Sequence, residues 1–227
     1  MPHQRLLEVC AFTVPSCILA EQSGAARIEL CRDYAAGGLT PLYDTIQLAI
    51  ESTSIPIYPI IRPRGGDFFY SYEEFDEIKK NIITCKQLQC PGIVTGISLQ
   101  NGEIDTQRLK ELVVLAHPMK VTCHRVFDRT PDPYKALEDI ITTGCERILT
   151  SGQAPVAVDA TALIAALVKQ AGDRIIIMPG SGVRASNIAQ LIQETGANEF
   201  HSSARVPETG ELDRQELQQM LDILKLP

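Results

Sequence analysis

Eight short apolar runs recur along the 227-residue chain, and this repetition is the feature that most limits its possible folds. The runs are dominated by Val, Ile and Leu, which is typical of strands buried on both faces of a parallel sheet. They cover residues 6–12, 27–31, 55–62, 92–99, 120–127, 145–151, 174–179 and 198–202. Each is followed by a segment long enough for a helix, so the pattern predicts a strand and a helix, eight times.

The segments between the runs carry the start and stop signals of helices. Thr13 with Pro15 precedes a segment that Gly24 ends, and Ser71 with Glu74 has the spacing of a capping box. The other predicted starts are Thr40-Pro41, Asp105, Asp132-Pro133, Asp159 and Ser186, with a last helix from 211. Eight such units joined by right-handed crossovers fit a closed (β/α)8 TIM barrel. Because no linker interrupts the series, we predict a single domain over residues 1–227.

An open doubly wound sheet is the competing architecture. That fold would carry a glycine-rich turn after its first strand when it binds a dinucleotide, and "CAFTVPS" contains no glycine. We therefore expect no organic cofactor. The barrel remains the preferred fold.

The net charge and the cysteine pattern limit the classes of partner and the compartment that we expect for this protein. Twenty-eight acidic against 21 basic residues leave a net charge of −7, which disfavours nucleic acid or an anionic membrane surface as a partner. No apolar stretch approaches the length of a membrane span, and the first residues lack a signal-peptide pattern, so we expect a cytoplasmic protein. The seven cysteines form no CxxC pair and are expected to be reduced thiols.

The carboxyl ends of the strands are where a parallel barrel carries its working residues. The first two predicted strands each contain a glutamate two residues before a cysteine, Glu8-x-Cys10 and Glu29-x-Cys31. Side chains at i and i+2 of a strand share a face, so each pair points to one side. A buried carboxylate needs a partner, and Arg62 is the nearest candidate by strand order. The carboxylates form either a structural ion-pair network or an acid–base pair.

Later strand ends add candidates for anion binding and proton transfer. Arg62 and Arg64 in "RPRGGDF" suit a carboxylate or phosphate. His124 with Asp128, and His201 at the end of the eighth strand, are candidate acid–base groups. Two loops resemble the phosphate-binding turns of barrels, and each could instead be a simple turn. Their candidate residues are Gly180, Ser181 and Gly182 after the seventh strand, and Ser202 and Ser203 after the eighth.

Cys10 and Cys31 could bring two sulfur atoms to one soft ion, which suits Cu(I). The alternative is that both thiols are small core residues, because two ligands from strands make a weak metal signature.

Several blocks together resemble the CutC family. They are "LLEVCAF", "ARIELC", "GGLTP", "IIRPRGGDFFYS", "VTCHRVFD", "RILTSGQ" and "EFHSSA", spread over residues 6–204. The resemblance implies a cytoplasmic TIM barrel, a homo-oligomer (dimer or tetramer), and a role in copper homeostasis. It also implies that copper binds to the cysteines of the first two strands, which are Cys10 and Cys31 here. The chain departs from the family pattern at Cys123, at Val126 and at 179–182.

Two functions therefore remain open. One is Cu(I) binding and release by Cys10 and Cys31, with the copper ion as partner. The other is an enzyme acting on a small anionic metabolite, with Glu8, Glu29 and His124 moving protons. In that case the arginines and the two loops would hold the anion.

Overall fold

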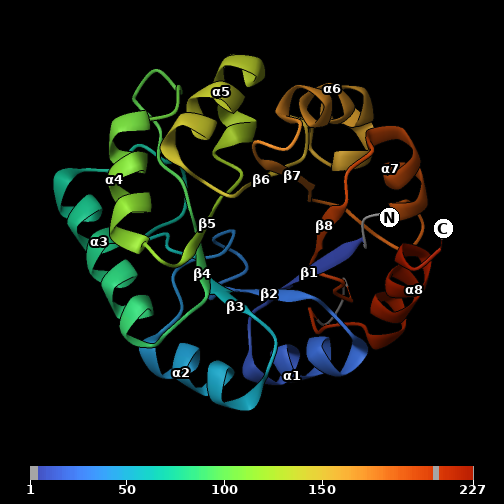
Figure 1. Cartoon of the computed structure of the whole chain (residues 1–227). Coiled ribbons are helices and arrows are strands. Elements are labelled where there is room, and N and C mark those ends of the chain that lie inside the picture. The colour runs from blue at the N-terminus through green and yellow to red at the C-terminus, as the bar shows by residue number, and fades with distance from the viewer. Residues whose placement is uncertain (1–4, 207–209, 227) are drawn as a thin grey trace.

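The computed structural model describes residues 5–206 and 210–226, and these form the predicted barrel. All eight expected strands are present, each shorter than the apolar run that contains it. Their bounds are β1 Leu6–Ala11, β2 Arg27–Leu30, β3 Ile57–Pro59, β4 Gly92–Thr95, β5 Lys120–Cys123, β6 Arg147–Thr150, β7 Ile176–Pro179 and β8 Glu199–Ser202. Figure 1 shows them at the centre of the molecule, surrounded by a ring of helices.

The helices alternate with the strands along the chain. They are α1 Val14–Ser23, α2 Tyr43–Ser52, α3 Tyr72–Gln87, α4 Thr106–Ala116, α5 Pro133–Thr143, α6 Thr161–Ala171, α7 Ile188–Thr195 and α8 Arg214–Leu224. Two short 3-10 helices, η1 Phe127–Arg129 and η2 Ala157–Ala160, lie after β5 and β6. The predicted N-caps Thr13, Asp105 and Asp132 accept backbone N–H groups, and Ser71 with Glu74 completes the capping box.

Three predicted helix starts were wrong. The Thr40 hydroxyl bonds to the backbone of Arg62 instead of capping a helix, so α2 begins at Tyr43. The turn at η2 precedes α6, whose N-cap is Ala160 and not Asp159. Ser186 is likewise outside α7, which begins at Ile188 with Asn187 as its N-cap residue.

The strands pair in parallel in two arcs, β3-β2-β1-β8 and β4-β5-β6-β7. A bridge between Ile60 and Val94 joins the arcs at one seam, and β7 lies beside β8 at the other. The register places Cys10 opposite Glu29 and Glu8 opposite His201. The two Glu-x-Cys pairs are therefore staggered by two residues, and this stagger decides which side chains meet inside the barrel.

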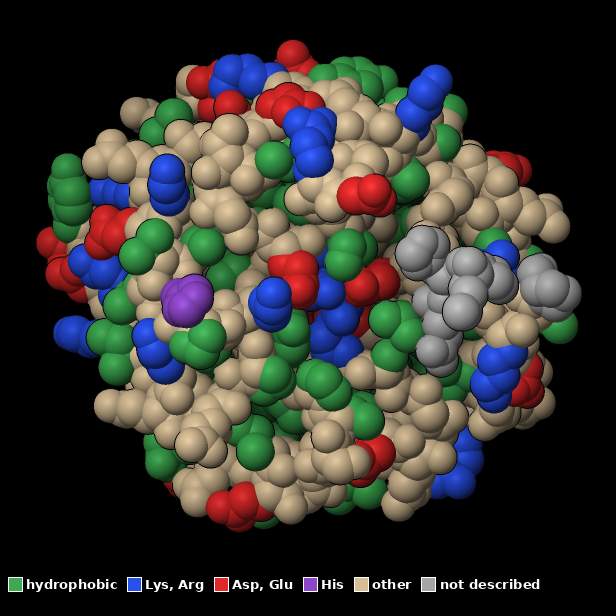
Figure 2. Space-filling view, in the orientation of Figure 1, with side chains coloured by type: hydrophobic (Ala, Val, Ile, Leu, Met, Phe, Trp, Pro, Cys, Tyr) green, Lys and Arg blue, Asp and Glu red, His purple; other side chains and the backbone are tan. Residues whose placement is uncertain are grey.

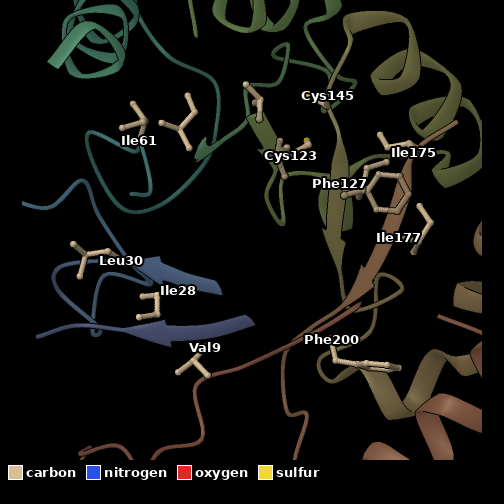
Figure 3. Close-up of a cluster of buried hydrophobic side chains, with 14 of the residues drawn as sticks. Val9, Ile28, Leu30, Ile61, Cys123, Phe127, Cys145, Ile175, Ile177 and Phe200 are labelled. Atoms are coloured by element: carbon tan, nitrogen blue, oxygen red, sulfur yellow. The ribbon is translucent and has the colours of Figure 1, made fainter. Parts of the chain in front are cut away.

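Along each strand, side chains alternate between the outer face of the barrel and its interior. Val9, Ile28, Leu30 and Phe200 pack outward against the helices with other buried apolar residues (Figure 3). Side chains at the alternate positions point inward. They include Glu8, Glu29, Arg27, Arg147 and Glu199, all buried. The barrel interior thus contains a group of charged side chains beside a small apolar cluster of Cys31, Tyr58, Ile60 and Val94, in place of uniformly aliphatic layers.

Charged residues also gather at the centre of the face drawn in Figure 2, over the barrel. Over residues 5–206 and 210–226, none of the helices is both long enough and apolar enough to cross a membrane.

Candidate functional site

A cavity of about 390 Å³ opens at the carboxyl ends of the strands. Residues from the loops after six strands line it, so the carboxyl ends of the strands do surround one shared opening, as predicted. The lining residues are Cys10, Phe12, Glu29, Cys31, Tyr34, Gly37, Gly38, Ile60, Arg62, Phe68, His124, Arg125, Leu149, Ser181, Gly182, Val183, Arg184, His201, Ser202 and Ser203.

The two thiols meet at this mouth. The Sγ atoms of Cys10 and Cys31 are 3.7 Å apart, and Cys10 is the more exposed of the two. A carboxylate oxygen of Glu29 completes a group whose atoms all lie within 4.8 Å of one another. The stagger of β1 and β2 explains the set, since Cys10 faces Glu29 in register while Cys31 lies one inward position further along β2.

Glu8 lies deeper in the barrel and is fully enclosed. Its carboxylate accepts a hydrogen bond from Arg27 Nε and lies 2.8 Å from His201 Nδ1. Arg27 also donates to Glu199 at 2.6 Å, and Arg147 donates to Glu199 at 3.0 Å. The buried charges therefore form a connected network in which every carboxylate has a cationic partner.

Arg62 was expected to meet the glutamates, and this expectation was wrong. Its guanidinium donates to the carbonyls of Ala36, Gly37 and Gly38 from Nη1, at 3.1 to 3.2 Å, and to Gly66 from Nη2 at 3.2 Å. The partner of Glu8 is Arg27, which sequence analysis missed. Period-two counting could have found it, because Arg27 lies two residues before Glu29 on the same face of β2.

The charged groups in the barrel interior shift one another's pKa values in different directions. Burial alone would raise the pKa of Glu8, but the His201 hydrogen bond and the Arg27 charge lower it to about 2. Burial raises the pKa of Glu29 well above its usual value. For His201, bonds to Cys10 and Glu8 and the charge of Glu29 outweigh burial and raise the pKa. The shifts therefore favour the ionised form of Glu8, the protonated form of Glu29 and the cationic form of His201.

The same cluster acidifies one thiol. The hydrogen bond from Cys31 lowers the pKa of Cys10 to about 5, and His201 acts in the same direction against burial. Burial and the neighbouring Cys10 raise the pKa of Cys31. The pair therefore holds one thiolate and one thiol, and the thiolate lies beside the His201 imidazolium.

His124 reaches the cavity without the predicted carboxylate. Its Nδ1 atom accepts the N–H of Val126 at 3.2 Å, and its Nε2 atom has no hydrogen-bond partner among the described residues. Burial and the charge of Arg62 lower its pKa to about 3, so the ring is neutral.

Asp128 does not join His124 or line the cavity. Its carboxylate accepts bonds from the Thr150 hydroxyl at 2.5 Å and from the backbone N–H groups of Ser151 and Gln153 at 3.0 and 3.2 Å. It pairs with Arg125 at 2.8 Å. Asp128 thus ties the β5 loop to the β6 loop, since η1 turns its side chain toward β6.

Arg64 and Gly180 also lie outside the cavity lining. Arg64 pairs with Glu74 at 2.5 Å and with Asp67 at 2.9 Å, which ties its guanidinium to the loop before α3. Gly180 sits under the mouth, where a Cβ atom would lie 2.4 Å from Leu149 Cδ1 and 3.2 Å from His201 Cβ. Its lack of a side chain leaves room for His201.

The two loops predicted to bind an anion do border the cavity. Ser181, Gly182, Ser202 and Ser203 line it. The Ser181 hydroxyl donates to the carbonyl of Pro155, and the Ser202 hydroxyl donates to that of Val183. Both hydroxyl protons are thus engaged within the protein.

Eight lining side chains are outside the set of candidates predicted from the sequence, namely Phe12, Tyr34, Ile60, Phe68, Arg125, Leu149, Val183 and Arg184. Phe12 and Arg125 directly follow strands whose ends were already candidates, so their position was a usable signal. Arg184, two residues beyond the Gly180–Gly182 turn, carried no comparable signal.

Comparison with known proteins adds a family to this geometry. The model of the CutC family matches residues 5–206. A CutC family protein from Parabacteroides distasonis is 50% identical over 203 residues, covering 89% of this chain and 84% of the relative. One from Chromobacterium violaceum is 47% identical over 201 residues, covering 88% and 81%.

Solved structures agree with these matches. The CutC protein of Streptococcus agalactiae, to which a copper homeostasis role is provisionally ascribed, is similar with a TM-score of 0.83 and 32% identity. The match covers 88% of this chain and 98% of that one. N-(5'-phosphoribosyl)anthranilate isomerase from Pyrococcus furiosus has a TM-score of 0.65 at 12% identity over 97% of this chain and 98% of its own, which supports the barrel fold alone.

Proposed function

Because this chain belongs to the CutC family, we propose that it is a copper homeostasis protein that binds Cu(I) through Cys10 and Cys31 at the barrel mouth. The observation that carries the proposal is the 3.7 Å separation of the two Sγ atoms, in a barrel whose other five cysteines are buried. Soft thiolate ligands select Cu(I) over harder ions.

The separation also predicts the geometry of binding. With metal–sulfur bonds of about 2.3 Å, as in zinc thiolates, two sulfurs at a roughly tetrahedral angle lie about 3.8 Å apart, and a linear pair lies about 4.6 Å apart. The thiols here match the bent arrangement without backbone movement. A bent pair leaves space for a third donor, and Glu29 is the group within reach.

Proton release accompanies binding in this proposal. The lowered pKa of Cys10 favours its thiolate, whereas the raised pKa values of Cys31 and Glu29 favour their protonated forms, so these two groups are the ones expected to release protons. His201 lies 3.6 Å from Glu29 through its Nε2 atom and can balance the charge that the ligands gain. Copper affinity should therefore rise with pH.

A Cu(I) titration under reducing conditions, against a colorimetric Cu(I) chelator, tests the proposal. The Cys10→Ala/Cys31→Ala variant should lose tight binding, and Glu29→Gln should bind more weakly than the native chain. Cys85→Ala/Cys90→Ala is the matched control, because it removes two buried thiols that do not line the cavity. Native affinity in the first double variant would refute the Cu(I) site.

A second candidate is an enzyme that acts on a small anionic metabolite. The specific observation in its favour is a carboxyl–imidazole pair at one cavity, where Glu29 lies 3.6 Å from His201 Nε2 and both groups have raised pKa values. A neighbouring carboxyl and imidazole can act as a general acid and a general base. A thermal-shift screen of metabolites tests it. A compound that stabilises the native chain but not His201→Gln, with Cys31→Ala unaffected, would favour the enzyme over the copper site.

A further inference from the structure

Arg62 is a buried cation with only neutral neighbours. It is 6% exposed and lines the cavity, and four backbone carbonyls hold its two Nη atoms. Asp67, the nearest acidic residue in the sequence, pairs with Arg64 instead, and so does Glu74. The described residues thus leave the charge of Arg62 without a carboxylate, although a buried charge is costly unless it is paired.

His124 is a second group with unmet bonding capacity in the same wall. It is 4% exposed, and its Nδ1 atom is occupied by the Val126 N–H, so the proton of the neutral ring is on Nε2. Among the described residues neither His124 Nε2 nor Arg62 Nε has a hydrogen-bond partner. Buried donors without partners are rare and call for a specific explanation.

Phe68 holds the two groups together. The Arg62 guanidinium lies 4.9 Å from the centre of the Phe68 ring, and the His124 ring centre lies 4.6 Å from it. The buried Tyr70 hydroxyl adjoins Arg62 but brings no negative charge, because burial raises its pKa to about 12. One fixed positive charge and one fixed neutral donor therefore share an apolar platform at the cavity.

We propose that Arg62 and His124 form an oxyanion subsite that binds the carboxylate of a small organic monoanion inside this cavity. Guanidinium and imidazole N–H groups are suitable donors for a carboxylate. Within the subsite a phosphate dianion would meet only one positive charge, that of Arg62, because His124 stays neutral. The cavity of about 390 Å³ sets the size of the ligand to that of a small metabolite.

The ligand then extends toward the thiol side of the mouth. Cys31 and Arg62 approach the same loop, as a Cβ atom on Gly38 would lie 3.3 Å from Cys31 Sγ and one on Gly37 would lie 3.1 Å from Arg62 Nη1. A carboxylate held by Arg62 thus places the rest of the molecule beside Glu29 and His201. This inference rests on the second candidate function for its cavity and does not require copper.

Calorimetric titration with acetate, lactate and inorganic phosphate tests the subsite. Lactate should bind the native chain, and His124→Phe, which keeps the ring and removes the donor, should weaken it about tenfold or more. Arg62→Gln should do the same. Arg174→Gln is the control for loss of one positive charge, since Arg174 is paired with Glu138 at the surface. Tighter binding of phosphate than of both carboxylates would overturn the monoanion assignment.

Arg62→Gln could fail to fold because it loses four carbonyl contacts, so a measurement on the native chain is needed as well. The nitrogen-15 signal of His124 Nε2, assigned by its absence from His124→Phe, should shift as lactate is added. An unchanged signal, or native affinity in His124→Phe, would refute the subsite. Cu(I) titration of the same variants separates the two proposals, since His124→Phe should keep native copper affinity whatever happens to lactate.

Discussion

Glu8 and His201 lie opposite each other in the β1–β8 register, and the Glu8 carboxylate is 2.8 Å from His201 Nδ1. This contact turns the other ring nitrogen toward Glu29, at 3.6 Å. The protonation of the mouth therefore depends on a carboxylate one layer deeper in the barrel. The charged network is part of the site even where its members do not line the cavity.

Loss of Glu8 should be costly for stability. Glu8→Gln leaves the Arg27 guanidinium with half of its ion pairs in a buried setting, and breaking such a pair costs about 3–5 kcal/mol. Urea denaturation should show a lower free energy of unfolding at an unchanged m-value. Glu138→Gln is the matched control, because its pair with Arg174 is exposed and should contribute little. Equal effects of the two substitutions would contradict the network.

Acid should destabilise the native chain through His124. The pKa of this ring is about 3 in the folded protein against 6.5 when unfolded, so only the unfolded chain takes up the proton between these values. The contribution of the neutral ring to the free energy of unfolding is complete above pH 6.5. It is lost as the pH falls toward 3, at up to about 1.4 kcal/mol per pH unit. The free energy of unfolding of the native chain should fall more steeply than that of His124→Phe from pH 6.5 downward. Parallel pH profiles would contradict a buried neutral ring.

Cys10 should be the most reactive thiol. It is partly exposed while the other six cysteines are buried, and its pKa of about 5 makes it a thiolate at neutral pH. Brief treatment with iodoacetamide, followed by peptide mass spectrometry, should place the label on Cys10. Cu(I) added first should block it. In Cys10→Ser the rapid labelling should disappear, whereas transfer of rapid labelling to Cys17 would contradict the exposure pattern.

A methyl group at position 180 should disturb the mouth from below. Gly180→Ala places Cβ 2.4 Å from Leu149 Cδ1, and such overpacking costs about 1–3 kcal/mol. The same substitution should cost less in a Leu149→Ala background, which removes the clashing atom. A double-mutant cycle of unfolding free energies measures this coupling. Additive effects of the two substitutions would contradict a contact between the new methyl group and Leu149.

The glycine at 92 has a similar role near the other end of the barrel, where a Cβ atom would lie 2.3 Å from the Tyr58 ring. Large and small inward residues alternate between neighbouring strands here. This pattern can be recognised in the sequence only when the strand register is already known.

Much of the architecture could be predicted because it depends on local periodicity. The apolar runs mark all eight strands, and alternation within each strand places Glu8 and Cys10 on one face. The direction of parallel strands then brings their carboxyl ends to one edge, which is why Cys10, Cys31, His124 and His201 were correctly expected at a common mouth.

The pairing of charges could not be predicted, because it depends on how far neighbouring strands slide past each other. Arg27 begins β2 and Arg62 follows β3, and the register that places Glu8 opposite Arg27 decides that Arg27 reaches the carboxylate. Asp128 is four residues from His124, yet the turn at η1 directs it to the β6 loop.

The sequence by itself thus determined the number of strands, the face on which each polar side chain lies and the end of the barrel that carries the site. Only the tertiary structure decided which arginine pairs with the buried carboxylates and which lines the cavity without a carboxylate partner among the described residues. The physical reason is that strand periodicity is a property of consecutive residues, whereas stagger and loop direction come from packing a closed barrel.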